Sequence, residues 1–196
     1  MRIIRPSSKN EMVLAFLKAE IDSLDHRGNI EGALRARGYS RAIVDNADLG
    51  NSGENLARAQ ALSYSRAGLF VGFPDNVIWQ RISLSIEELG RVKYICQDVF
   101  VKASGGTRLV SDGARNFEAG AFDEETSSRI LGIEVAVKRG RRLPELIVVG
   151  ESEDSGLILL EGHKRATAYV RTAGCFPKGV EAIAGFSRDL NDWKWH

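Results

Sequence analysis

The stretch from Pro144 to Gly174 constrains the fold of this chain more than any other part of its 196 residues. Two apolar runs, Leu146–Val149 and Leu157–Leu160, have the length of buried β-strands. Residues 151–156 between them are polar and predict a turn. After the second run the apolar period becomes helical. The stretch therefore predicts a strand, a turn, a second strand, a tight turn and a helix.

A glycine corner joins the second strand to the helix. Gly162 allows the backbone to turn sharply and a ligand to approach it closely, and the helical period starts at His163. Gly174 is expected at the C′ position, where a left-handed residue ends many helices. The first turn of such a helix offers unpaired N–H groups and the positive end of the helix dipole, which attract anions. The corner is therefore a candidate anion site.

Two basic residues, Lys164 and Arg165, lie in the first turn of the expected helix. Exposed cations at this end of a helix are unfavourable by about 0.3–1 kcal/mol each. Their presence suggests that they have a binding role, such as contact with a phosphate through two N–H groups of the arginine. The alternative is structural: Arg165 pairs with Glu161 or another carboxylate, and the helix packs on a sheet. The residues leave these two interpretations open.

The composition narrows the classes of function. The chain is 43% hydrophobic and 27% charged, as soluble globular proteins are, and its net charge of +1 provides no overall basic field for nucleic acid. The chain has two cysteines without CxxC spacing, which argues against a disulfide framework. Its three histidines are far apart in the sequence, which, with so few cysteines, argues against a structural zinc site. Neither a signal peptide nor an apolar run of ~20 residues is evident. We expect a soluble, cytoplasmic protein with no metal-ligating residues of its own and no membrane partner.

Residues 1–95 carry mainly helical patterns. Ser8 and Glu11 form a capping box, and the helix after it has an apolar stripe. Arg58 and Arg66, in an alanine-rich helical stretch, are expected to be solvated. The stripe consists of Val13, Phe16, Leu17, Ile21 and Leu24, and the expected helices run from Ser8 to Gly28, from Ile30 to Arg37 and from Glu54 to Ala67.

Residues 96–196 alternate strand and helix patterns. We therefore expect an α/β (α+β) fold with a small mixed sheet and packed helices, divided into a mainly helical region over residues 1–95 and an α/β domain over residues 96–196. Beyond the central stretch, the expected elements are a strand over Asn76–Leu84, a helix from the capping box Ser85–Glu88 to about Ile95, a strand over Val99–Val101, a helix from Asp123 to Arg139, a strand over Val180–Phe186, and a tail, Asp189–His196, packed on the body.

Two further features could contact anions. The segment Ser104–Arg108 has two glycines followed by Thr107 and Arg108, which could form a concavity of backbone N–H groups; an ordinary hairpin or surface loop is the alternative. Four basic residues also cluster where the helix from Asp123 ends. They complement the negative end of its dipole, and a phosphate or nucleic-acid contact is the alternative. The cluster consists of Lys138, Arg139, Arg141 and Arg142.

The segments Pro144–Val149 and Leu159–Ala168 resemble the core of the ParB/sulfiredoxin superfamily. That family carries a "P-L-x-V" strand, a second strand and a "(D/E/G)-G-x-x-R-x-x-A" turn into a helix, and the likeness covers roughly residues 104–186. It implies a small α/β fold whose turn holds nucleotide phosphates, as in ParB CTPases, sulfiredoxins, an archaeal kinase for free serine and ParB-like nucleases. It places Gly162, Lys164 and Arg165 at the phosphates, and Thr107 and Arg108 in an arginine-bearing loop.

The chain also departs from this family. His163 stands where sulfiredoxins have a cysteine, which argues against peroxiredoxin repair. The helix-turn-helix module of ParB is not expected in Ser187–His196, and the "E-N-x-x-R" motif is absent, which argues against chromosome partitioning. Kinase-like members use a carboxylate near the turn. Glu161 is the nearest candidate base here, unless it only holds Arg165 in place.

Three functions follow from these patterns. The first is a nucleotide-dependent phosphotransferase or hydrolase that uses ATP, ADP or CTP with Mg²⁺. The second is a non-catalytic module that senses a nucleotide or another phosphate-bearing small molecule, with the N-terminal helices engaging a protein partner. The third, a ParB-like nucleic-acid-binding protein, is less favoured by the near-neutral charge. In the first, Glu161 and Arg165 are catalytic, and the phosphate contacts come from Gly162, His163, Lys164, Arg165, Thr107 and Arg108.

Overall fold

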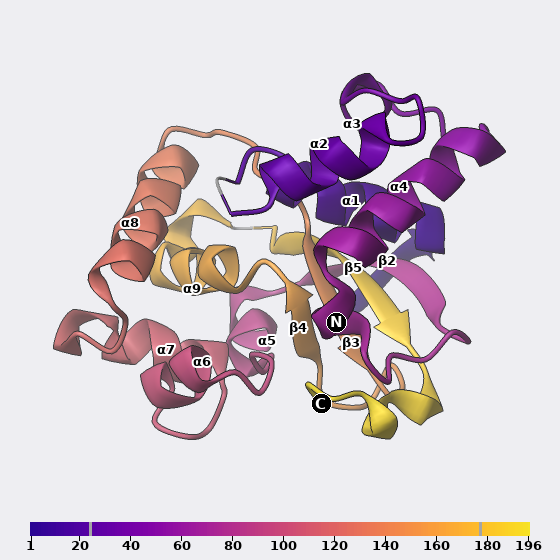
Figure 1. Cartoon of the computed structure of the whole chain (residues 1–196). Helices are drawn as coiled ribbons and strands as arrows, with labels where there is room; N and C mark the ends of the chain where they lie inside the picture. Colours follow the sequence, from indigo (N-terminus) through magenta and orange to yellow (C-terminus); the bar gives the residue numbers. More distant parts are fainter. Residues whose placement is uncertain (24, 177) are drawn as a thin grey trace.

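A five-stranded mixed sheet forms the centre of the molecule (Figure 1). The computed structural model describes residues 1–23, 25–176 and 178–196. Neighbouring strands β3 and β5 are parallel, and the other three neighbouring pairs are antiparallel. The strands, in sheet order, are β1 (Arg2–Pro6), β2 (Ile78–Leu84), β5 (Val180–Phe186), β3 (Leu146–Gly150) and β4 (Ile158–Glu161).

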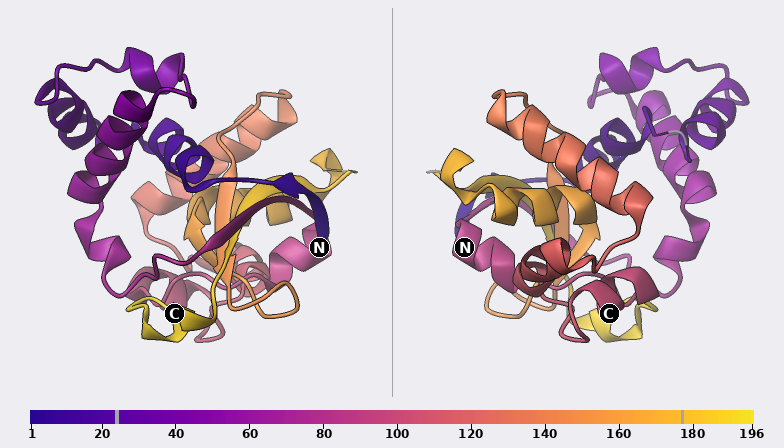
Figure 2. Two further views of the ribbon diagram at one scale, coloured as in Figure 1. Left: turned by 90° about the vertical axis from the view of Figure 1, so that its right-hand side faces the viewer. Right: turned by 90° about the vertical axis from the view of Figure 1, so that its left-hand side faces the viewer.

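Helices α1–α4 gather on one side of this sheet and helices α5–α9 on the other (Figures 1 and 2). Helix α9 packs against α7 and α8. The helices of the first group are α1 (Lys9–Glu20), α2 (Arg27–Arg35), α3 (Ala42–Asp45) and α4 (Ser52–Ser65). Those of the second are α5 (Ile86–Arg91), α6 (Asp98–Ala103), α7 (Val110–Asn116), α8 (Glu124–Lys138) and α9 (His163–Arg171).

Strand β3 is buried along its whole length. Because helices cover both faces of the sheet, this strand is a continuous apolar run and does not alternate with polar residues. The sequence predicted β2, β3, β4 and β5 and the mixed α/β class, and the structure confirms them. Strands β1 and β2 come from residues 1–95, and β3, β4 and β5 from residues 96–196. The boundary expected near residue 95 stays a prediction, and the sheet takes strands from both sides of it.

Tertiary contacts overrode local patterns at several places. A strand was expected over Val99–Val101, which is wrong, because the segment lies in α6 with Phe100 and Ala103 buried one helical turn apart. The helix expected to run to Ile95 ends at Arg91, because the backbone of Lys93 bonds instead to that of Leu157 and Leu159.

The ends of two other helices also differ from expectation. Helix α1 is capped by Ser8 as predicted but ends at Glu20, and α2 already begins at Arg27, so Gly28 lies in its first turn. The expected stripe position Leu24 lies outside the described residues. Helix α9 ends at Arg171, and Gly174 belongs to a following 3₁₀ turn with no left-handed φ.

The C-terminal segment packs on the body, as expected. Trp193 is buried, and its indole Nε1 donates to the backbone oxygen of Leu69 over 2.7 Å. The indole of Trp195 donates to the oxygen of Gly68 over 3.0 Å. Both bonds fasten the chain end to the segment after α4, which leads toward β2.

Arg58 is fully buried, so the expectation that it is solvated is wrong. Its guanidinium donates to the backbone oxygens of Ile43 (2.7 Å) and Asp48 (2.9 Å). It also bonds to the side chains of Glu54 (3.0 Å) and Asn55 (2.6 Å). One arginine therefore holds α3, the loop after it and α4 together.

Replacing this arginine tests that role. Arg58→Met keeps an apolar stem but leaves buried oxygens without a donor, so we expect the free energy of unfolding to fall by about 2–4 kcal/mol. Urea unfolding followed by circular dichroism measures the change. Arg91→Met, at an exposed pair with Glu87, is the control and should change stability by less than about 0.5 kcal/mol. Equal midpoints for the two variants would contradict the structural role of Arg58.

Candidate functional site

The corner between β4 and α9 is built around one glycine. Gly162 has a φ of 100°, in the left-handed region. A Cβ atom at this position would lie 2.5 Å from Cδ2 of Leu146, so only glycine fits without a shift. The amide of Ala166 donates to the oxygen of Gly162 over 2.8 Å, and no side chain among the described residues caps α9. The N–H groups of the first turn are therefore available to a ligand.

A cleft of about 850 Å³ opens in front of this corner. The five residues from Glu161 to Arg165, predicted from the sequence as the site, all line it. The N-terminal region contributes Glu20, His26 and Arg66 to the lining. Helix α8 contributes residues such as Arg129 and Ile133. Residues that are far apart in the sequence therefore meet at the predicted corner.

Arg165 pairs with Glu161, which is the structural alternative raised by the sequence. Its Nη2 lies 3.1 Å from Oε1 of Glu161 and 3.4 Å from the backbone oxygen of Glu145. Both side chains are largely buried, at 11% and 13% exposure. Nε of Arg165 is enclosed and has no partner among the described residues. The guanidinium thus holds the Glu161 carboxylate across the corner.

Lys164 differs from the other cations of the cleft. Arg66, Arg129 and Arg165 each face a carboxylate at ion-pair distance, whereas Lys164 forms no ion pair within the described residues. It is half-buried at the positive end of α9. Burial and, second, the charge of Arg129 lower the pKa of its ammonium group. Its charge is the one that an entering anion would neutralise.

His163 lies on the floor of the cleft as a neutral imidazole. Its ring stacks on Phe100 with centroids 4.6 Å apart and an interplanar angle of 19°. Nε2 is enclosed and has no partner among the described residues. Burial lowers the pKa of His163 from 6.5 to about 4, against the opposing influence of the Glu161 charge. The ring is therefore uncharged at pH 7.

Thr107 and Arg108 do not line this cleft. The hydroxyl of Thr107 bonds to Asp112 over 2.7 Å. The guanidinium of Arg108 donates to the backbone oxygens of Tyr94 (2.9 Å) and His196 (3.0 Å). The structure thus places these two residues in a turn that fastens the C-terminal segment, apart from the corner at Gly162.

The basic cluster that ends α8 is exposed and does not line the cleft either. Lys138 lies 3.7 Å from Glu134, one turn earlier in the same helix. Arg139, Arg141 and Arg142 follow it at the surface. Cations at this helix end complement its dipole, and the structure adds no contact with the corner.

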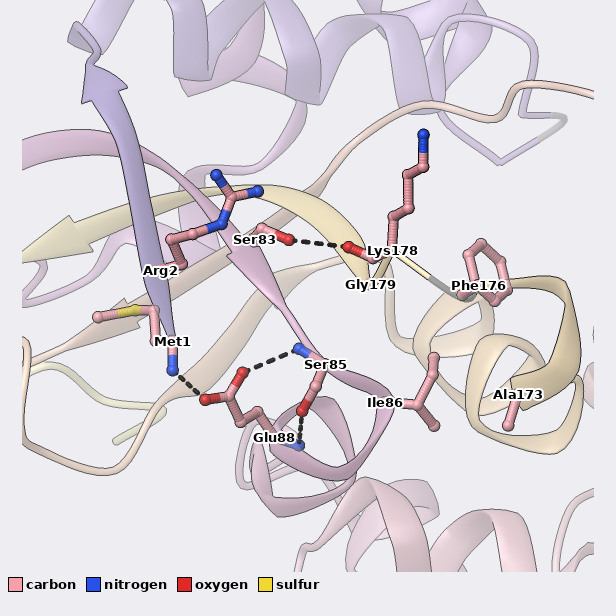
Figure 3. A pocket seen from close by; sticks show the side chains of 10 residues that line it. All are labelled: Met1, Arg2, Ser83, Ser85, Ile86, Glu88, Ala173, Phe176, Lys178 and Gly179. Carbon is pink, nitrogen blue, oxygen red and sulfur yellow. Dashed lines mark hydrogen bonds and ion pairs between the residues drawn. The ribbon is translucent and has the colours of Figure 1, made fainter.

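A second hollow of about 540 Å³ lies beside β1 and α5 (Figure 3). Its carboxylate, Glu88, accepts from the backbone N–H of Ser85 and pairs with the amino group of Met1. The Ser85 hydroxyl in turn accepts from the backbone of Glu88. These groups satisfy one another as a capping box, so the corner at Gly162 remains the candidate site.

The sequence missed the residues that the N-terminal region contributes. Arg66 was expected to be solvated; its side chain is 29% exposed, and it also lines the cleft and pairs with the buried Glu20. Its Nε lies 2.7 Å from Oε2 of Glu20, and its Nη2 bonds to Oε1. The two residues are 46 positions apart, so no local spacing indicates the pair.

Comparison with protein-family models, curated proteins and solved structures found no match. Among the helices that the structure describes, none is long and apolar enough to cross a membrane. The described residues also hold no group of three or more histidine, cysteine, aspartate or glutamate side chains placed for a metal ion. The functional argument therefore depends on the geometry of the cleft.

Substituting the corner glycine tests the constraint on the backbone. Gly162→Ala should lower the free energy of unfolding by about 1–3 kcal/mol through backbone strain, and by more through the clash with Leu146. Gly132→Ala is the matched control, since this glycine also lines the cleft, lies inside α8, and an added Cβ would meet no described atom within 4 Å. It should stabilise by about 0.5–1 kcal/mol. Urea unfolding of both variants measures the difference, and equal effects would refute the constraint.

The pKa of His163 predicts a pH dependence of stability. Because the folded-state pKa is about 4 and the ordinary value is 6.5, the folded state binds fewer protons in this range. The stabilisation is complete above pH 6.5 and is lost as the pH falls toward 4. Relative to His163→Gln, the unsubstituted protein should lose about 2–3 kcal/mol between pH 7 and pH 4. Urea unfolding at several pH values checks this, and parallel curves for the two proteins would count against a buried neutral His163.

Proposed function

We propose that the cleft binds a phosphate-bearing small molecule with its phosphate at the N-terminal end of α9. One observation carries this proposal: Lys164 stands half-buried and without an ion pair among the described residues, beside an uncapped helix N-terminus, in the cleft. A cation at the positive end of a helix is unfavourable by itself. An anion at the same place is attracted by the Lys164 ammonium and by the positive end of the helix, and it offsets the repulsion between them.

A nucleotide suits the remainder of the cleft. Its volume of about 850 Å³ lies within the range of small-molecule sites, roughly 300–1,000 Å³. A group of apolar lining residues offers a surface for a base, namely Gly132, Ile133, Ala136 and Leu143. ATP, ADP or CTP is the ligand class that we propose, with Mg²⁺ entering on the phosphates and completing its shell with a cleft carboxylate or water.

The resemblance to the ParB/sulfiredoxin superfamily supports the same proposal. The order of β3, β4, the left-handed glycine and α9 follows the strand–strand–turn–helix order of that family's motif. The proposed phosphate contacts are the N–H groups of the first turn and Lys164, and the buried neutral ring of His163 supports the turn beneath them. Arg165 is paired with Glu161 and supports the corner. We also propose that it contacts the phosphate, as the resemblance implies.

Catalysis forms the second part of the proposal. Phosphoryl transfer depends on clamping and positioning of phosphates more than on covalent chemistry by the protein. Glu161 lines the cleft and is held by Arg165, so it could accept the proton of a hydroxyl group or water that attacks the phosphate. A module that senses a nucleotide without consuming it is the alternative.

The test is a titration of ADP with Mg²⁺ by isothermal calorimetry. Lys164→Gln removes the unpaired charge and should weaken binding tenfold or more, about 1.4 kcal/mol, with little loss of stability. Lys138→Gln, at the exposed end of α8, should leave the affinity unchanged.

Turnover separates the two parts of the proposal. Chromatography of ATP or CTP incubated with the protein, alone and with candidate acceptor alcohols, measures consumption. Glu161→Gln should abolish consumption and keep binding if this carboxylate is the base. Binding without consumption supports the sensing alternative. Absence of nucleotide and phosphate binding in the unsubstituted protein would refute the function proposed for the cleft.

A further inference from the structure

Arg66 reaches the cleft from the N-terminal region. It is the C-cap residue of α4 and lines the same cleft as the first turn of α9. Its guanidinium lies 5.9 Å from the ring centroid of Phe16, in a cation–π contact. The N-terminal region therefore supplies a charged group to the lining of the cleft.

Glu20 fixes the orientation of this guanidinium. The carboxylate is buried and bonds to Nε and Nη2, which lie on one edge of the planar group. The other edge carries Nη1, and within the described residues Nη1 forms no hydrogen bond and is not enclosed. With 29% of the side chain exposed, this second edge is available to an anion that enters the cleft.

The positive charge of Arg66 also affects the titratable side chains around it. Its charge lowers the pKa of both His26 and His163, which line the cleft. The Nε2 atom of His163 is enclosed without a partner among the described residues. The acidic neighbours Glu20 and Glu161 already face arginines. The free edge of the Arg66 guanidinium is therefore the cationic group that the N-terminal region offers to an anion, in a lining that also contains Asp22 and Asp25.

We infer that Arg66 binds a second anionic group of the ligand, so that the cleft selects molecules with two adjacent phosphates over those with one. This inference rests on the proposed function, since the first phosphate is the one placed at Lys164 and the helix end. Both residues line one cleft of about 850 Å³, which is far larger than a single phosphate. A guanidinium edge matches two phosphate oxygens, whereas the ammonium of Lys164 acts as a point charge.

The experiment compares inorganic pyrophosphate with orthophosphate by isothermal calorimetry. The unsubstituted protein should bind pyrophosphate at least tenfold more tightly. Arg66→Met should lose tenfold or more of its affinity for pyrophosphate and less than threefold for orthophosphate. Arg66→Lys should fall between, because it keeps the charge and loses the planar fork.

A double variant keeps the test decisive if Arg66→Met folds poorly with Glu20 left unpaired. Glu20→Gln/Arg66→Met removes both charges of the pair and should show the same selective loss, with folding checked by circular dichroism. An equal loss for both anions, or no loss for either, in a folded variant would overturn the role of Arg66 and leave the proposed function standing. Failure of the unsubstituted protein to bind either anion would overturn the proposed function itself.

Discussion

The pairing of β5 with strands on both of its sides is the constraint on which the rest of the structure depends. Antiparallel pairing joins β5 to β2 from Ile78↔Phe186 to Leu84↔Val180, and parallel pairing joins it to β3. The first pairing fixes the N-terminal region to the sheet, and the second fixes β3, which in turn pairs with β4, the strand that leads into the glycine corner. Both parts of the chain can line one cleft because a single strand holds them in register.

The sequence predicted the corner because every signal for it is local. An apolar run, a glycine and a helical period within about a dozen residues define β4, Gly162 and α9, and the structure has them in that order. The same holds for the cap of α5 by Ser85 and the cap of α8 by Asp123. Short-range spacing suffices where the stabilising contacts are themselves short-range.

The cleft could not be predicted in the same way, because its contacts join distant segments. The pair of Arg66 with Glu20 links α4 to α1, and the pair of Arg129 with Asp25 links α8 to the segment after α1. Burial of His163 follows from stacking on Phe100, which lies in a helix where a strand was expected. The edge strand β1 was missed because all five of its residues are exposed and show no apolar alternation.

The double attachment of β5 also has a consequence for how the chain can be divided. A fragment that began after residue 95 would lack β2 and would leave one edge of β5 bare, with seven residues of unpaired donors and acceptors. Bare edges of this kind recruit strands from neighbouring molecules. Truncation at that position would therefore favour aggregation of the shortened protein through the bare edge of β5.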